Sequence, residues 1–175
     1  HYYTKSLKLT EKSSIAELSL KNNIASLLIN SGKYDEAKII LQEILNFKLI
    51  NTNALLKSTV LFNLGYALFK QNSNEGLREM LASLKLKDET SFEASSIENY
   101  LKIAEYYELK DKPTAINYLK KALKLATKHK SIDNKISALK KLIPLTKNDA
   151  SLNYSEEYIR LNDSITSVRN QAKNQ

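Results

Sequence analysis

A helix-turn-helix outline that returns along the chain is the feature that most restricts its fold. Residues 31–45, SGKYDEAKIILQEIL, combine a glycine turn with a regular apolar stripe, and worn versions follow at residues 71–84, 110–123 and 147–161. The stripe repeats every three or four residues, which is the period of an amphipathic helix. The sequence therefore predicts consecutive helices paired across short turns.

The expected helices are short and account for most of the chain. Only three Gly and two Pro are present, too few for the turns that sheets and hairpins require, so the predicted fold class is all-α. We expect helices at residues 2–9, 12–30, 33–47, 53–70, 73–86, 91–108, 113–130, 132–142 and 150–161, and a polar last helix from residue 163.

Two turns show why the chain reverses. Gly32 follows an expected helix end, where glycine takes a left-handed conformation without steric cost. After this turn, Tyr34 supplies a ring to wedge between the helices and Ala37 allows close approach. Pro113 falls in a first helical turn, where its missing amide hydrogen costs nothing, and Asp111 is the expected cap.

A small residue recurs in the first helix of each pair, at intervals of about 40 residues. Ala25, Gly65 and Ala104 hold this place, and the second helix begins with another small residue, although the second pair departs with Gly76 followed by Leu77. The pattern resembles the tetratricopeptide repeat. This resemblance implies a right-handed α-solenoid of antiparallel helix pairs that binds proteins or peptides without catalysis.

On this resemblance the chain divides into repeats. Residues 1–10 are expected to be the second helix of a truncated repeat, which suggests a fragment of a longer protein. Residues 11–50, 51–88 and 89–130 are the expected full repeats, 131–162 a degenerate repeat, and 163–175 a polar C-terminal helix. The last segment, with Asp163 and Ser164 as helix opening, resembles the end of repeat arrays in certain bacterial sensor regulators.

The net charge of +8 is concentrated in one stretch. Residues 110–141 hold ten lysines and two acids, so the rest of the chain is neutral on balance. The chain has 24 Lys and 3 Arg, and Arg is the side chain that makes forked contacts to phosphate and guanine, so nucleic acid is an unlikely partner. One interpretation is that these lysines form a solvated surface. The other is that they bind an anionic partner through a basic patch, which consists of Lys120, Lys121, Lys124 and Lys128.

Residues that could carry catalysis or bind a metal are sparse. His129 lies in a lysine-rich helix end, His1 begins the sequence, and cysteine is absent. The three glycines are too far apart for a phosphate loop. We therefore expect no enzyme, cofactor or metal site. A chain without cysteine fits the cytoplasm and the periplasm equally, and no apolar run has the length of a membrane span, so localisation stays open.

A binding surface remains as the expected functional site. In the tetratricopeptide family the first helices line a concave groove that takes a peptide or partner helix. The resemblance places twelve candidate contacts there: Asn22, Asn23, Ser26, Asn30, Phe62, Asn63, Tyr66, Phe69, Lys70, Glu98, Lys102 and Glu105. Their amides and rings suit an extended backbone and apolar anchors.

The expected function is thus a non-enzymatic module that binds a protein or peptide, as the sensing or scaffolding part of a larger bacterial signalling regulator. Two alternatives stay open. One is a basic-surface binder of nucleic acid or an acidic partner, whose affinity would fall steeply with salt. The other is a repeat-type auxiliary regulator of response-regulator phosphorylation, for which no catalytic side chain is evident.

Overall fold

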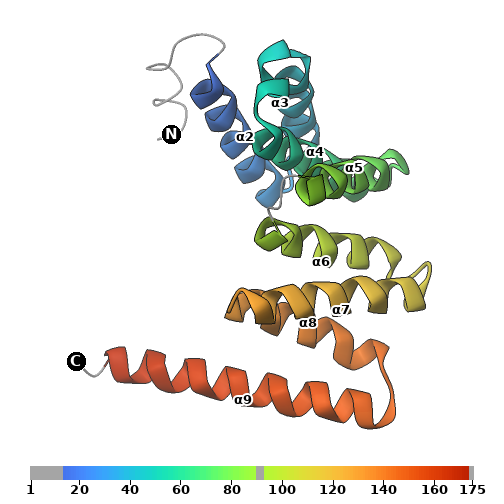
Figure 1. The fold of residues 1–175 in the computed structure, drawn as a ribbon, viewed down its shortest axis with the longest axis vertical. Coiled ribbons are helices and arrows are strands. Elements are labelled where there is room, and N and C mark those ends of the chain that lie inside the picture. The colour runs from blue at the N-terminus through green and yellow to red at the C-terminus, as the bar shows by residue number, and fades with distance from the viewer. Residues whose placement is uncertain (1–13, 90–92, 174–175) are drawn as a thin grey trace. The chain divides into compact units, whose positions relative to one another are not determined.

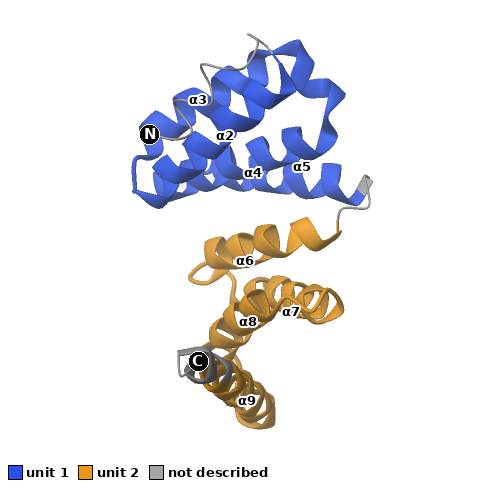
Figure 2. Cartoon of the chain, turned by 90° about the vertical axis from the view of Figure 1, so that its left-hand side faces the viewer, with its two compact units in different colours: residues 1–92 blue, residues 93–175 orange. Residues whose placement is uncertain are grey.

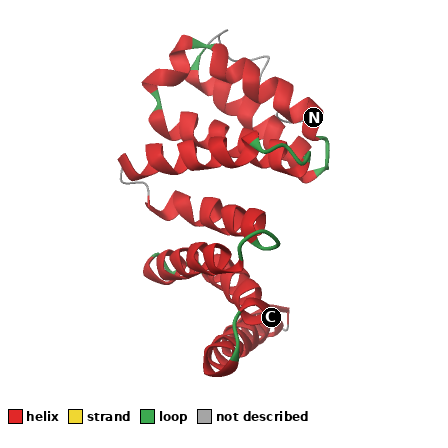
Figure 3. Cartoon of the chain, turned by 90° about the vertical axis from the view of Figure 1, so that its right-hand side faces the viewer, coloured by secondary structure: helices red, strands yellow, loops and turns green. Residues whose placement is uncertain are grey.

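The computed structural model describes residues 14–89 and 93–173, with side chains described up to residue 167, and every regular element in these ranges is a helix (Figure 3). The chain divides into two compact units, residues 1–92 and 93–175 (Figure 2). The predicted all-α class is confirmed for the described residues. The expected helix at residues 2–9 and the segment 1–10 lie outside the described residues.

Each unit is a series of short helices in which sequence neighbours pack side by side (Figure 1). Unit 1 contains α2 (Ile15–Asn30), α3 (Tyr34–Asn46), the 3-10 helix η1 (Lys48–Thr52), α4 (Ala54–Lys70) and α5 (Glu75–Glu89). Unit 2 contains the 3-10 helix η2 (Glu93–Ser95), α6 (Ser96–Tyr107), α7 (Lys112–Lys128), α8 (Ile132–Leu145) and α9 (Asn148–Lys173).

The apolar stripes form a core in each unit. In unit 1, Leu18, Leu41 and Ile44 are completely buried, and Tyr34 packs against their cluster, as its position in the turn predicts. In unit 2, Leu119 and Leu142 are buried with a row of alanines on α7. Burial of a whole Leu or Ile side chain contributes about 1.5–3 kcal/mol, so these stripes supply the main stabilisation of the helix pairs.

Three helices end with the same backbone motif but with different residues. After α2, Gly32 adopts the predicted left-handed conformation, at φ 75°, and the next amide, that of Lys33, donates to Leu28 O at 2.9 Å. Asn72 after α4 and Lys130 after α7 repeat the motif, at φ 60° and 53°. Glycine alone makes this conformation free of steric cost. The motif closes a helix by satisfying its last carbonyls.

Side-chain caps begin several helices. Asn53 Oδ1 accepts a hydrogen bond from the Leu56 amide at 2.9 Å at the start of α4. At α7, Asp111 accepts from the amide of Thr114 at 3.2 Å and from its hydroxyl at 2.6 Å, and Pro113 lies in the first turn. The cap and the proline position are both as the sequence predicts. These hydrogen bonds hold the Asp111 pKa below its ordinary value.

Helices α4 and α5 of unit 1 meet at two glycines. A Cβ at Gly65 on α4 would lie 2.6 Å from Gly76 O, and a Cβ at Gly76 on α5 would lie 2.5 Å from Gly65 O. Real side chains essentially never approach backbone so closely, so both positions require glycine at this helix separation. In the other pairs the corresponding positions hold alanine: Ala25 with Ala37, and Ala104 with Ala115. Glycine at position 76, where the second pair departs from the repeat pattern, therefore goes together with glycine at position 65 on the facing helix.

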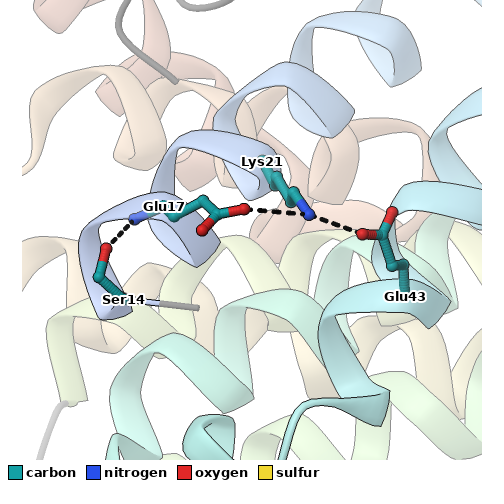
Figure 4. Close-up of polar contacts among 4 residues, drawn as sticks. All are labelled: Ser14, Glu17, Lys21 and Glu43. Atoms are coloured by element: carbon teal, nitrogen blue, oxygen red, sulfur yellow. Dashed lines mark hydrogen bonds and ion pairs between the residues drawn. The ribbon is translucent and has the colours of Figure 1, made fainter. Parts of the chain in front are cut away.

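A charged contact joins the first pair, α2 and α3. Ser14 caps α2 by accepting from the Glu17 amide, and the Lys21 ammonium lies 3.3 Å from Glu17 Oε1 and 2.6 Å from Glu43 Oε1 (Figure 4). The same ammonium lies 5.3 Å from the ring centre of Phe47. The hydrogen bond to Glu43 is the main cause that raises the Lys21 pKa above its ordinary value. Lys21 therefore stays charged and links the two helices.

Two sequence expectations about helix extent need correction. The separate polar helix from Asp163 is wrong, because α9 continues unbroken from Asn148 through that position. Neither glycine nor proline interrupts residues 150–173, and the Thr166 hydroxyl donates to the Asn162 carbonyl inside the helix. Asp163 and Ser164 thus do not begin a helix. Helix α8 also runs three residues beyond its expected end, with Pro144 in its last turn.

Candidate binding surfaces

The open face of α2 carries a strip of polar side chains with one apolar residue. Asn23 and Asn30 are exposed and Ser26 is half-buried, at the helical spacing expected for one face. Leu27 lies between them with half of its surface exposed. Sequence reasoning missed Leu27, because a leucine within a helical stripe is normally assigned to the core. We call Asn23, Ser26, Leu27 and Asn30 the α2 strip.

One face of α4 is aromatic and basic. The rings of Phe62 and Tyr66 stack at 6.5 Å between centres, and Tyr66 and Phe69 follow at 6.1 Å. The Lys70 ammonium lies 5.3 Å from both Tyr66 and Phe69. Phe62 is only 9% exposed, so it belongs largely to the interior, whereas the others are half-buried. We call Asn63, Tyr66, Phe69 and Lys70 the α4 strip.

A hydrogen bond between two asparagines connects these helices. Asn63 Nδ2 on α4 donates to Asn22 Oδ1 on α2 at 2.9 Å. Asn22 is 5% exposed, so it fixes the spacing of two first helices and is a poor candidate for direct peptide contact. The repeat pattern predicted that Asn22 would face a bound peptide. Its burial depends on its partner Asn63 on α4, which the pattern does not specify.

A buried lysine beside Phe62 was also missed. The Lys87 side chain on α5 is 4% exposed, and its ammonium lies 5.5 Å from the Phe62 ring centre. A buried ammonium requires a compensating interaction, and the face of an aromatic ring provides one. Because Lys87 follows an ordinary solvated-lysine pattern on α5, the sequence contains no signal for this contact.

On α6 in unit 2, the three predicted contact residues form one charged row. The Lys102 ammonium lies 3.8 Å from carboxylate oxygens of both Glu98 and Glu105. All three side chains remain at least one-fifth exposed. Pairing within the row lowers its net charge to about that of a single carboxylate, which weakens any purely electrostatic attraction.

The basic patch lies along α7. Its four lysines are exposed, and the buried side of the same helix consists of Ala115, Leu119, Ala122 and Ala126. Lys128 forms a very short hydrogen bond with Glu93, the main cause that lowers the Glu93 pKa. Exposed His129 lies 3.6 Å from the same carboxylate, which suits its predicted position at a helix end. The patch is thus open at Lys120, Lys121 and Lys124 and neutralised at Lys128.

A cluster of tyrosines adjoins this patch and was not anticipated. Tyr107 on α6 and Tyr118 on α7 stack at 6.0 Å with nearly parallel rings, and Tyr100 lies 6.0 Å from Tyr118. The Lys121 ammonium lies 5.3 Å from the Tyr118 ring and 5.9 Å from the Tyr100 ring. Burial raises the Tyr118 pKa above its ordinary value, so its hydroxyl stays protonated at neutral pH.

Within the described residues, no group of three or more His, Asp or Glu side chains could hold a metal ion. A search of the described helices for a membrane span also finds no candidate of sufficient length and apolarity. The arrangement can supply amide hydrogen bonds, ring contacts and ammonium groups, which are the means of binding another chain.

Sequence-neighbouring helices that pack in consecutive pairs are the arrangement of helical repeat modules. Residues 18–49 match the family model of the tetratricopeptide repeat, so this segment, which spans most of α2 and all of α3, is such a repeat. No curated protein matches the chain. Tetratricopeptide repeats are generally non-catalytic interaction modules, which indicates a scaffold that binds proteins or peptides.

Proposed function

We propose that unit 1 binds an extended peptide segment of another protein across the α2 and α4 strips. The observation that supports this proposal is the Asn22–Asn63 hydrogen bond, which fixes the two helices beside one another. Asn23 and Asn30 present amides that can donate to and accept from a peptide backbone. The Tyr66 ring gives rigid apolar area at low entropic cost. Charged α6 residues Glu98, Lys102 and Glu105 are a further proposed contact in unit 2.

Selection of peptides tests this assignment without a known partner. The probe is a phage-displayed library of random dodecapeptides, panned on the full 175-residue chain. The affinity of a selected, fluorescein-labelled peptide is then measured by anisotropy. We expect Tyr66→Ala to weaken binding at least about tenfold, as for an aromatic anchor, and Asn23→Ala to weaken it several-fold.

Matched controls lie on the second helices of the same unit. Gln42 on α3 and Lys85 on α5 are exposed and belong to neither strip. The double variant Gln42→Ala/Lys85→Ala should bind the peptide as the unchanged chain does. If the control variant loses as much affinity as Tyr66→Ala, or if Tyr66→Ala loses none, the strips are not the binding surface.

We further propose that this scaffold is the sensing or scaffolding part of a bacterial signalling regulator. The support is the scaffold character of the repeat together with the resemblance of the last segment to regulator arrays. The second part of this support is weakened, because α9 runs without a break across Asp163, where the regulator pattern would begin a new helix. A bacterial two-hybrid screen against sensor kinases and response regulators tests it. A specific pair that requires Tyr66 supports the proposal, and selection of unrelated partners alone contradicts it.

A further inference from the structure

Helix α7 carries an uncompensated positive charge. Residues Lys112–Lys128 include no Asp or Glu, and Lys120 and Lys124 are exposed. Within the described part of the chain, neither of these two ammonium groups lies at ion-pair distance from a carboxylate, whereas Lys128 is paired with Glu93 and Lys135 with Glu157. The middle of α7 therefore presents two exposed ammonium groups, those of Lys120 and Lys124, with no carboxylate partner among the described residues. We call Lys120, Lys121 and Lys124 the basic ridge.

The third ammonium of the basic ridge is held in place by rings. Lys121 lies over Tyr118 and Tyr100, and Tyr118 is itself stacked on Tyr107. Such contacts restrict the motion of the ammonium group. An ordered ammonium loses less conformational entropy when it binds an anion than a freely rotating one. The ridge thus combines two open lysines with one that is already positioned.

The spacing of the ridge fits carboxylates on an extended chain. Lys120 and Lys124 are four residues apart on a helix, a rise of about 6 Å. Alternate side chains of an extended peptide point the same way and lie about 7 Å apart. We propose that the basic ridge of α7 binds an extended acidic protein segment in which Asp or Glu occupies alternate positions. This site is separate from the α2 and α4 strips of unit 1.

Nucleic acid fits the same surface less well. Single strands gain affinity when bases stack on open aromatic faces. Here Tyr107 covers Tyr118 on α7, and the Lys121 ammonium lies over both Tyr118 and Tyr100, so few ring faces stay open. Arginine, whose fork matches phosphate, does not occur in α7. A peptide needs only the ammonium groups.

Anisotropy with three labelled probes tests the acidic-segment site. The first peptide alternates Glu and Ser and contains five Glu, the second has five Glu at every third position, and the third probe is single-stranded oligothymidylate with twelve nucleotides. On the full chain we expect the alternating peptide to bind at least several-fold tighter than the second peptide and tighter than the oligonucleotide. Its affinity should fall as salt is raised.

Charge-matched variants separate the ridge from general electrostatics. Lys120→Gln/Lys121→Gln/Lys124→Gln should weaken binding of the alternating peptide at least about tenfold. Lys48, Lys85 and Lys147 are exposed lysines outside α7, and their triple change to Gln removes the same charge. This control should change affinity less than about twofold. Equal losses in both variants, equal affinity for both peptides, or tighter binding of the oligonucleotide would each overturn the proposal.

Discussion

The two units solve the same packing problem with different residues at equivalent places. In unit 1, α4 and α5 meet through Gly65 and Gly76, whereas in unit 2 the corresponding positions of α6 and α7 hold two buried alanines, Ala104 and Ala115. Glycine permits backbone contact, and alanine keeps the helices apart by a methyl group. The repeat pattern requires only a small residue, so the actual helix separation depends on which small residue each partner carries.

Among the changes that test this comparison, a methyl group added at the glycine contact should have the largest effect on the free energy of unfolding. Gly76→Ala places a Cβ 2.5 Å from Gly65 O and 2.6 Å from the Phe69 amide nitrogen, and neither backbone atom can rotate away. We expect a loss of about 3 kcal/mol in the free energy of unfolding, measured by urea denaturation. Hydrogen exchange should rise in α4 and α5.

The reciprocal change in unit 2 serves as the control. Ala115→Gly removes a buried methyl near the start of α7 and should cost about 1 kcal/mol, because glycine lowers helix propensity and leaves a small space. Exchange should rise in α6 and α7 only. In an ordinary helix, Gly→Ala is stabilising by a similar amount, so a stabilised Gly76→Ala protein would show that the two backbones are not in contact.

A second difference concerns the polar link of unit 1, where the first helices α2 and α4 share the Asn22–Asn63 hydrogen bond. Asn63→Ala removes the donor and leaves the buried Asn22 oxygen without it, which should cost about 2 kcal/mol. Exposed Asn23→Ala is the matched control and should cost less than about 0.5 kcal/mol. In a double-mutant cycle with Asn22→Ala, additive losses would contradict a direct coupling.

These particulars show what the sequence can and cannot predict. Periodicity located α2 to α8 and the first half of α9, but it wrongly predicted a separate helix from Asp163. Local rules predicted the Gly32 turn and the Asp111 cap, since each depends on residues close in the chain. The reciprocity of Gly65 with Gly76 and the burial of Asn22 depend on partners on another helix. Such contacts follow from packing, which no single periodic stripe specifies. The proposed binding roles of the strips stay predictions.

The helix ends give a third comparison, with a smaller effect. The same left-handed turn is held by Gly32 in unit 1 and by Lys130 in unit 2. A non-glycine residue in this conformation is strained by about 1–2 kcal/mol. Glycine avoids this strain, but it loses more backbone entropy on folding, so the net gain in stability is smaller. Lys130→Gly should therefore stabilise by about 0.5 kcal/mol, and Gly32→Lys should destabilise by about 1 kcal/mol. Melting curves of both variants test the opposite signs.

The smallest expected effect concerns pH, to which the helix caps of α7 and α4 should respond differently. Asp111 caps α7 with a carboxylate whose pKa is lowered by its hydrogen bonds to Thr114, whereas the cap of α4 is the neutral amide of Asn53. Because the pKa of Asp111 is lower in the folded state, its carboxylate contributes its full stabilisation above the ordinary Asp pKa of about 4. This contribution is lost as the pH falls through the lower, folded-state pKa.

Asp111→Asn keeps an acceptor for the Thr114 amide but removes this titration. The difference in stability between the original chain and the variant should thus shrink as the pH falls below about 4. Asn53→Asp should introduce the same kind of dependence at α4, because a carboxylate at a helix start is favoured only while ionised. Hydrogen exchange at several pH values locates each change to its own helix. An unchanged difference across this range would mean that Asp111 acts only as a hydrogen-bond acceptor, as Asn53 does, and that its charge makes no contribution.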